Sequence, residues 1–499
     1  MVLLKIFTAL LFTFSSAYYV WQLQLNGYFW KRSIKKLVFC PAFLLSVILS
    51  AVQTAVLIFA PDCAVWVGVA CAFLLFPFVF SGKKTPLVLT KRVGRWLVVN
   101  FVVFSALTLT LDEWVLVSVV LPVTFVADML LKPVNAAINA RYLKNARKKL
   151  KSFNCITIVV TGSYGKTSVK NILNTFLATK YDSVCSPSSF NTPLGLARFI
   201  NEIEKPPQAV VLEAGAKKRG DIAEICRWFR PDHAVICGVA PQHLDTFGSL
   251  DNVIAAKGEV LDFLTEKSFC VINADDVNSR RYTGKFNKLS AGMKGEDFSI
   301  KNLSITPDGT RFVVEDKKGK KYEIFTPLLG SINALNISMA FALAASLDCD
   351  PCALVEAAGK LSYVPHRLEL IKKDGWYILD DGYNANSKGV EGFLEVLSCF
   401  NGNKCVVAQG IVEMGKEGRQ VNYSFGKKLA KTADFCAVLG ENSDALKDGL
   451  SDGGMPSDKI FICTSLTDAV NKISGYVGDG GVIAFQNDLP DNMTKRRKK

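Results

Sequence analysis

Acidic side chains are scarce in the N-terminal part of this 499-residue sequence. Residues 1–151 contain 17 Lys and Arg but only four Asp and Glu, and the last five residues are all basic. Residues 152–494 hold 37 basic and 41 acidic side chains, so the formal net charge of +14 arises outside them. Because the main region is mildly acidic, its charge gives no reason to expect DNA or RNA, and we predict no nucleic-acid partner.

Close cysteine pairs are also lacking, although the chain has 14 cysteines. Only Cys349 and Cys352 stand in a C-x-x-C frame, and no second such pair completes a set of four ligands. A tetrahedral structural zinc site needs four ligands, so the sequence argues against a zinc ribbon. Scattered cysteines behave as small apolar residues in a reducing compartment, which favours a cytoplasmic location for the main region.

Long apolar runs dominate the sequence before residue 132, and each is close to the roughly 20 residues that a helix needs to cross a bilayer. They cover residues 3–20, 37–60, 63–80, 93–111 and 114–131. Basic residues fill the first and third loops and follow the fifth run, whereas acidic residues mark the second and fourth loops. The positive-inside rule then predicts a five-helix transmembrane module at 1–131 with its N-terminus outside and the remainder in the cytoplasm. A cleaved signal peptide at 1–20 is the alternative, and it would put the basic first loop outside.

The remainder is expected to be an α/β protein. Strand-like and helix-like segments alternate from residue 155, which predicts a mainly parallel sheet. A basic amphipathic linker at 132–152 is expected to lie near anionic headgroups. The expected domains are a central domain at 153–328, a helical bridging segment of it at 329–362, a C-terminal domain at 363–494 and a basic tail at 495–499.

The elements expected within these domains follow from apolar periodicity. Strands are predicted at 156–160, 208–215, 234–239, 269–275, 298–305, 311–316, 376–381, 404–410, 434–440, 459–464 and 481–486. Helices are predicted at 166–179, 219–229, 250–266 and 333–347.

The segment 160-VTGSYGKTS-168 has the context of a phosphate-binding loop, since it lies between a β-branched run and a helix-like segment. Gly162 and Gly165 allow backbone N–H groups to turn toward an anion, Lys166 supplies a positive charge, and Thr167 offers a hydroxyl to Mg²⁺. Val160 replaces the first glycine of the usual pattern, so the motif alone also fits a chance turn.

Three more residues could serve a metal site. Glu213 is expected at the end of a buried strand, where an unpaired carboxylate is costly. His243 is one of only three histidines, and Lys257 follows it on a predicted helix. Each residue also has a non-functional interpretation. Glu213 would be paired with a lysine, and His243 would be a surface histidine. Lys257 would be a solvated helix lysine, which on sequence alone is its default.

Seven ordered stretches of this sequence resemble the Mur ligases, and within them the MurF branch. They are 161-TGSYGKTSVKNIL-173, 191-NTPLG-195, 212-LEAGAKKRGDI-222, 243-HLDTFGSLDNVIAAKGEV-260, 330-GSINALNISMA-340, 365-PHRLE-369 and 380-DDGYNAN-386. The resemblance implies a central P-loop domain with a parallel sheet and a Rossmann-like C-terminal domain. It also implies ATP-dependent amide formation in bacterial peptidoglycan synthesis, in which D-Ala-D-Ala is joined to a muramoyl tripeptide through an acyl phosphate.

The same resemblance implies a role for each matching residue. In the loop, ATP would contact Gly162, Ser163, Gly165, Lys166, Thr167 and Ser168. Asn333 and Asn336 would face the adenine side, Arg367 the phosphates and Asp381 the ribose, with Tyr383, Asn384 and Asn386 in the hinge motif. Two Mg²⁺ ions are implied, one held by Thr167 and Glu213 and the other by His243 and a carbamylated Lys257. Lys166, His243, Lys257 and Arg367 are the expected catalytic residues.

Three departures from the family concern the substrate more than the catalytic centre. Ile332 occupies a position that is usually His, and 485-FQNDLPDNM-493 replaces a Lys-Gly-Ser motif. The apolar module stands where the family has a soluble domain for the UDP-sugar. The acceptor is therefore expected to be a UDP- or lipid-linked muropeptide, with membrane lipids as further partners and D-Ala-D-Ala or another amine as donor.

Other functions are compatible with parts of the pattern. A poly-γ-glutamate synthase also joins a Mur-like core to membrane segments, and a folylpolyglutamate synthase fits less well. A transporter or a non-catalytic ATP-binding membrane scaffold is the alternative outside enzymes. Retention of Thr167, Glu213, His243 and Lys257 argues against a scaffold that has lost activity.

Overall fold

The computed structural model describes residues 87–110, 113–187, 190–242, 244–382, 387–411 and 417–486, together with a few single positions before residue 60. The expected spans at 3–20, 37–60 and 63–80 lie outside the described residues apart from those positions, as do the basic tail, His243, Tyr383, Asn384 and Asn386. The chain divides into two compact units, of which the first ends at Arg141 and the second begins at Tyr142.

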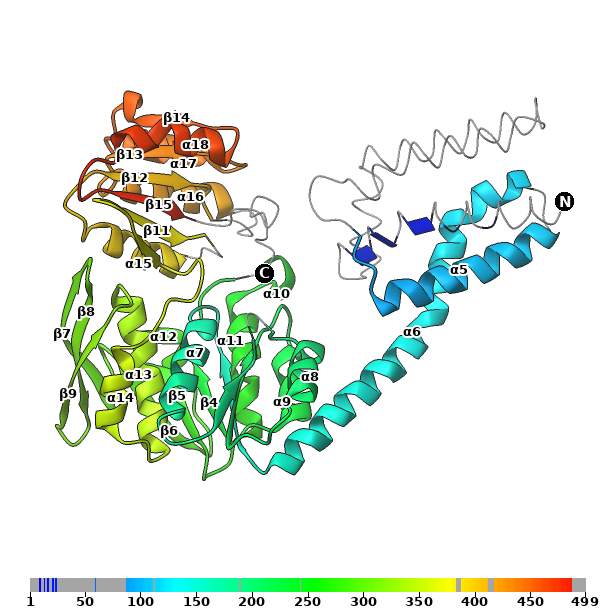
Figure 1. Cartoon of the computed structure of the whole chain (residues 1–499), viewed down its shortest axis with the longest axis horizontal. Helices are drawn as coiled ribbons and strands as arrows, with labels where there is room; N and C mark the ends of the chain where they lie inside the picture. Colours follow the sequence, from blue (N-terminus) through cyan, green and yellow to red (C-terminus); the bar gives the residue numbers. More distant parts are fainter. Residues whose placement is uncertain are drawn as a thin grey trace. The chain divides into compact units, whose positions relative to one another are not determined.

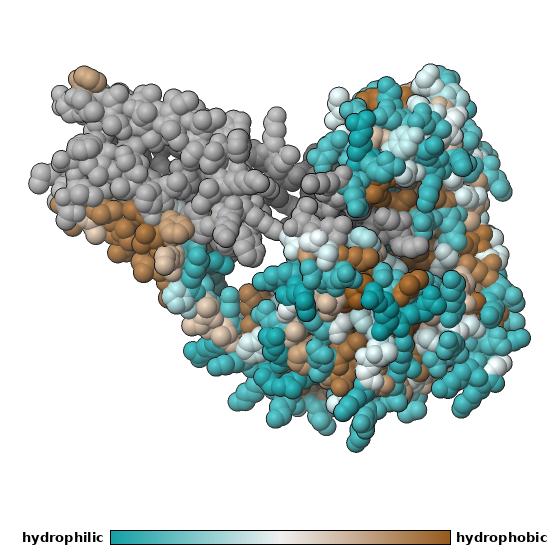
Figure 2. Space-filling view, turned by 180° about the vertical axis from the view of Figure 1, so that it is seen from behind, coloured by the Kyte–Doolittle hydropathy of each residue, from teal (hydrophilic) through white to brown (hydrophobic). Residues whose placement is uncertain are grey.

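The first unit contains helix α5 (Lys91–Thr110), which includes residues 93–110 of the fourth expected span, and the larger part of α6 (Glu113–Phe153). Lys91–Leu109 is long and apolar enough to cross a membrane, and no other helix among the described residues meets that criterion. Figure 2 shows apolar side chains gathered on these helices. The exposed large apolar residues of the two helices include Val98, Val102, Leu109, Phe125, Val126, Met129, Leu130, Val134 and Ile138.

Helix α6 joins the fifth expected span and the expected linker into a single element. The boundary expected between residues 131 and 132 is therefore not a helix end. Pro133 lies inside this helix without ending it, although proline removes a backbone donor from a helix interior.

The last turns of α6 belong to the second unit and pack against it. Leu143, Ala146 and Leu150 are buried in one apolar cluster with Leu196 and Ile200 of α8 (Pro193–Glu202). Their spacing of three and four residues places them on one helix face. This part of the expected linker therefore turns its apolar stripe toward protein and not toward lipid. The basic residues Lys144, Arg147, Lys148 and Lys151 remain exposed.

A nine-stranded sheet in the order β2-β3-β1-β4-β5-β6-β7-β8-β9 forms the centre of the second unit. Pairing is parallel from β2 to β7 and antiparallel from β7 to β9. The strands are β1 (Ile156–Thr161), β2 (Ser183–Cys185), β3 (Ala209–Ala214), β4 (His233–Ile236), β5 (Phe269–Asn273), β6 (Asn287–Gly292), β7 (Phe298–Thr306), β8 (Gly309–Asp316) and β9 (Lys321–Thr326). The residues of β3 are buried throughout, as expected for a parallel strand covered on both faces.

Helices cover both faces of this sheet and form two apolar cores. In Figure 1, α7 (Lys166–Leu177) lies beside α13 (Ser331–Ser346), and these two helices with α14 (Pro351–Ala358) contribute to one core. The other core includes residues of α8, α9 (Asp221–Phe229) and α11 (Leu250–Gly258). Two short helices, α10 (Leu244–Phe247) and α12 (Val277–Arg280), and the 3-10 helix η2 (Glu259–Phe263) complete this part.

The C-terminal part of the second unit has a six-stranded sheet in the order β10-β11-β15-β12-β13-β14. Only the β10–β11 pair is antiparallel. The strands are β10 (Glu369–Lys372), β11 (Tyr377–Asp381), β12 (Lys404–Ala408), β13 (Phe435–Val438), β14 (Ile460–Ile462) and β15 (Val482–Gln486). The helices are α15 (Ser387–Leu397), α16 (Gly418–Leu429), α17 (Ser443–Asp452) and α18 (Leu466–Ile473), with the 3-10 helices η4 (Ser457–Lys459) and η5 (Ser474–Tyr476).

The expected α/β fold with mainly parallel sheets is confirmed. The helix predicted at 250–266 is too long, because α11 ends at Gly258 and a 3-10 segment continues only to Phe263. Strands β2, β6, β9 and β10 are additional to the predicted ones.

Candidate active site

The loop after β1 lies at the carboxyl edge of the nine-stranded sheet. β1 pairs with β3 on one side and β4 on the other, and the register sets Val160 beside Glu213 and Thr161 beside Ile236. In open α/β sheets, ligands bind outside the carboxyl ends of strands where the strand order changes direction. The register therefore brings the loop, Glu213 and the segment after β4 together at the place where such a fold binds a ligand.

Two glycines shape the loop as predicted. Gly162 has φ +147° and Gly165 has φ +77°, conformations that L side chains rarely adopt. α7 begins at Lys166, so its free N-terminal N–H groups face the loop and favour an anion. The Ser163 N–H donates to the Gly238 carbonyl at 2.7 Å, which fastens the loop to the segment after β4.

Lys166 folds back over the loop. Its Nζ donates to the carbonyl of Gly162 at 2.8 Å and to that of Ser163 at 3.3 Å. Burial lowers the pKa of Lys166, and the neighbouring Glu213 carboxylate opposes that shift. The amine is thus held where a bound phosphate would replace the two carbonyls as its partner.

The Glu213 carboxylate is held through both oxygens and is 1% exposed. Thr167 Oγ1 donates to Oε2 at 2.9 Å, and Asn191 Nδ2 donates to Oε1 at 3.2 Å. A hydroxyl and a carboxylate are the oxygen ligands that Mg²⁺ prefers, and they are adjacent here. The expected metal pair Thr167 and Glu213 therefore fits an Mg²⁺ ion.

Lys170 is a functional candidate that the sequence reasoning missed. It is fully buried on α7, and its Nζ lies 3.5 Å from Glu213 Oε2. The available signal was its spacing, because residues three and four apart on a helix share a face and Lys170 follows Thr167 and Lys166 by those intervals. Burial lowers the pKa of Lys170, again against the charge of Glu213.

Lys257 is buried, so the interpretation of this residue as a solvated helix lysine is wrong. It lies in the last turn of α11 with 2% of its surface exposed. Burial, and next the positive charge of Lys166, lower the pKa of Lys257 to about 7. A large fraction of its amine is therefore uncharged near neutral pH, as nucleophilic attack on CO₂ requires.

Arg367 reaches the loop from the segment before β10. Its Nη2 donates to Thr167 Oγ1 at 3.3 Å. The residues on either side have left-handed backbones, His366 with φ +62° and Leu368 with φ +48°. Such conformations cost about 1–3 kcal/mol each and persist where the surroundings enforce them. The Leu368 N–H donates to Asp381 Oδ1 at 3.2 Å, which ties this turn to β11.

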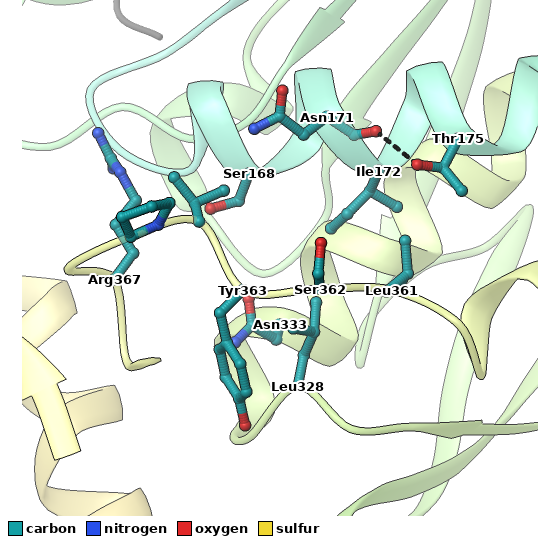
Figure 3. A pocket seen from close by; sticks show the side chains of 12 residues that line it. Ser168, Asn171, Ile172, Thr175, Leu328, Asn333, Leu361, Ser362, Tyr363 and Arg367 are labelled. Atoms are coloured by element: carbon teal, nitrogen blue, oxygen red, sulfur yellow. Dashed lines mark hydrogen bonds between the residues drawn. The ribbon is translucent and has the colours of Figure 1, made fainter. Parts of the chain in front are cut away.

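Two cavities flank the N-terminal turns of α7. The larger, about 150 Å³, is drawn in Figure 3, where Ser168 and Ile172 of α7 lie on one side and Leu361 and Ser362 on the other. The smaller, about 70 Å³, is lined by Tyr164, Asn336 and Asp381 among others. Ser168, Asn333 and Arg367 line both cavities. Burial raises the pKa of Asp381 to about 7.

The structure thus gathers most of the residues expected for ATP around α7. Tyr164, like Lys170, stands in a motif of the sequence but was not predicted to be a site residue. Its hydroxyl accepts a hydrogen bond from Asn273 Nδ2 at 3.3 Å. Ile332, which replaces the usual histidine, lines the smaller cavity and leaves no room for a Cβ on Gly392 of α15. The expected second metal site cannot be assembled from described residues alone, because His243 lies outside them.

Gly165→Ala tests the loop geometry. A Cβ at this position would lie 2.8 Å from Asn336 Oδ1, on a backbone with φ +77°. We expect a loss of about 1–2 kcal/mol in the free energy of unfolding from the left-handed conformation, and weaker ATP binding because Asn336 must move. Thermal unfolding and binding of a fluorescent ATP analogue measure the two effects.

Gly220→Ala is the matched control for that substitution. Gly220 has φ +92°, and nothing lies within 4 Å of an added Cβ. It should lose similar stability and keep its ATP affinity. Equal ATP affinity in the two variants would contradict the placement of Gly165 and Asn336 at the nucleotide.

A phosphate-binding loop at the carboxyl edge of a parallel sheet, next to a buried carboxylate, a buried lysine and an arginine from a second α/β domain, defines a nucleotide-dependent enzyme of the P-loop class. The sequence matches the Mur ligase middle domain over residues 160–344 and the Mur ligase glutamate ligase domain over residues 366–486.

Two curated relatives and one solved structure are similar over most of the chain. The UDP-N-acetylmuramoyl-tripeptide--D-alanyl-D-alanine ligase of Escherichia coli is 30% identical over 62% of this chain and 70% of its own length. The Bacillus subtilis ligase of that name is 28% identical over 70% of each chain. The MurF ligase of Thermotoga maritima in complex with ADP has a TM-score of 0.63 and 26% identity, covering 70% of this chain and 80% of its own.

The chain therefore belongs to the Mur ligase family. It is an ATP-dependent ligase that forms amide bonds.

Proposed function

We propose that the protein adds D-Ala-D-Ala to a muramoyl tripeptide, a step in peptidoglycan precursor synthesis. The observation that carries this proposal is a set of side chains gathered near one loop, namely Lys166, Thr167, Glu213, Lys257 and Arg367. Over 62% of its length the chain is also 30% identical to a ligase named for that activity. In this reaction the tripeptide carboxylate attacks the γ-phosphate of ATP to give an acyl phosphate and ADP. The amine of the dipeptide then displaces phosphate and forms the amide.

The residues of the loop and of its surroundings would position the triphosphate and neutralise it. Lys166 and the N-terminus of α7 would bind phosphate oxygens, and Arg367 would approach from the C-terminal domain. Asn333, Asn336 and Asp381 line the cavities beside the loop, where the base and the ribose would bind. Phosphoryl transfer depends mainly on such positioning and charge stabilisation, since the protein has little covalent work to do.

Mg²⁺ would be held by Thr167 and Glu213, and a second ion by His243 and a modified Lys257. Bound Mg²⁺ neutralises the charge that develops on the transferred phosphoryl group. Carbamylation of Lys257 is supported by its burial and by its pKa of about 7, because the neutral amine reacts with CO₂ and the product is an anion suited to a cation. A buried lysine would thereby become a metal-facing group.

We propose further that the protein is a multi-pass protein of the bacterial cytoplasmic membrane with its ligase domains in the cytoplasm. Support comes from the apolar length of α5, from the exposed apolar side chains of α5 and α6, and from the five apolar runs with alternating loop charge. The exposed basic residues near the end of α6 suit an anionic lipid surface. The acceptor would then be a lipid-linked muropeptide, or a UDP-linked one used close to the membrane.

Product mass spectrometry on the detergent-purified chain tests this proposal. Mg-ATP and D-Ala-D-Ala would be supplied with either UDP-MurNAc-tripeptide or the lipid-linked tripeptide. We expect the mass of one dipeptide to be added to at least one acceptor. Addition to the UDP form would assign the membrane segments to anchoring, and addition to the lipid form alone would make them part of substrate recognition. ATP binding without product on either acceptor would contradict D-Ala-D-Ala as the donor.

A further inference from the structure

We propose that Lys170 is a positioning residue that holds the Glu213 carboxylate in the orientation needed for Mg²⁺. The proposal rests on the metal site described under the proposed function, and it adds a residue to that site. Lys170 would act through Glu213 and not through contact with the nucleotide.

The geometry around Glu213 carries the proposal. Lys170 Nζ and Thr167 Oγ1 approach the same carboxylate oxygen, Oε2, at 3.5 Å and 2.9 Å. Asn191 holds the other oxygen at 3.2 Å. The two α7 residues stand one turn apart on the helix that starts at the phosphate loop. Glu213 Oε2 is therefore contacted both by a side chain expected to bind the metal and by a buried cation from the same helix.

The burial of this pair argues for a role beyond packing. Lys170 is 0% exposed and Glu213 1% exposed. A buried ion pair contributes little net stability, because desolvation offsets most of the attraction, and an apolar pair of similar volume is often as stable. A lysine at this position is therefore better explained by what Glu213 must do than by the needs of the core.

Lys170 offers the carboxylate two things that an apolar residue cannot. Its positive charge offsets the desolvation of Glu213 while no metal is bound, and its position restrains rotation of the carboxylate about the side chain. Residues that orient metal ligands in this way typically change metal affinity or activity by about 10–100-fold when substituted.

A double-mutant cycle in the nucleotide-free protein tests the coupling first. The variants are Lys170→Met, Glu213→Gln and the two combined, with Lys205→Met as the control because that lysine is exposed. We expect Lys170→Met to lower Tm, since it leaves a buried carboxylate without its cation. The combined variant should recover part of that loss, because the uncharged amide that replaces the Glu213 carboxylate needs no compensating cation. If the change in Tm of the combined variant equals the sum of the changes in the two single variants, the two residues are not coupled.

The Mg²⁺ dependence of nucleotide binding and of ligation then tests the function. We expect the free Mg²⁺ concentration at half-saturation to rise about 10–100-fold in Lys170→Met, and to stay unchanged in Lys205→Met. The combined variant should resemble Glu213→Gln alone, as expected if Lys170 acts only through that carboxylate. Lys170→Gln keeps a hydrogen-bond donor but removes the positive charge, so it separates the two contributions. The proposal would be overturned if Lys170→Met reached half-saturation at a free Mg²⁺ concentration within about twofold of that of the unsubstituted protein.

Failure of this proposal can be told apart from failure of the metal site. If Glu213 does not serve Mg²⁺, Glu213→Gln leaves the Mg²⁺ dependence unchanged. If Glu213 serves the metal and Lys170 does not position it, Glu213→Gln shifts that dependence and Lys170→Met does not.

Discussion

Lys166→Ala is expected to reduce the kcat of ATP-dependent amide formation by about 10³-fold. Lys166 Nζ lies 2.8 Å from the Gly162 oxygen, so its removal takes away a positive charge that would stabilise the transferred phosphoryl group. Single-turnover measurement of ADP and product formation at saturating ATP reports this step.

The control for Lys166→Ala is Lys205→Ala, which removes an exposed lysine from the same unit. Circular dichroism and Tm show whether each variant keeps its fold. A decrease of less than about tenfold in a folded Lys166→Ala protein would mean that the loop does not carry the phosphoryl transfer.

Lys257→Ala is expected to lower kcat by about 10²-fold or more, because it removes the group that carbamylation would turn into a metal-facing anion. The pH dependence follows from its lowered pKa. Since the amine loses its proton as the pH rises through about 7, carbamate content should increase over that interval at a fixed concentration of dissolved CO₂. ¹³C NMR of protein equilibrated with labelled bicarbonate measures the carbamate directly.

Lys257→Arg serves as the companion variant, because it keeps a positive charge but cannot form the carbamate under these conditions. We expect it to be as inactive as Lys257→Ala and to lack the labelled resonance. A fully active Lys257→Arg protein would show that this position needs a cation and not an anion.

Local residue patterns predicted the regular elements and the loop well. The β-branched run before the loop forms β1, and the glycines of the loop adopt the conformations that their positions required. Of the missed strands, β9 has the alternating pattern KYEIFT and was overlooked, whereas β2 and β6 have weaker local signals. β6, with the sequence NKLSAG, has little apolar alternation, and β2 is only three residues long. Their pairing with neighbouring strands defines them, and that information is not local.

The environments of the charged residues were harder to predict. On sequence alone the default for Lys257 is a solvated helix lysine, although Ala255, Ala256 and Val260 stand near it, yet packing of α11 buries it. Lys170 looks like one more basic residue on an amphipathic helix, and only the register between β1 and β3 brings Glu213 to it. Contacts between residues 43 positions apart depend on the whole sheet, which no single window of the sequence contains.

The packing of Leu143, Ala146 and Leu150 against α8 sets the N-terminal limit of the ligase as a folding unit. One continuous helix, α6, supplies residues to both compact units. A ligase fragment cut at the first strand would leave the apolar side of α8 uncovered. We therefore expect a ligase fragment that keeps this packing to start inside α6, near Tyr142, where the second unit begins.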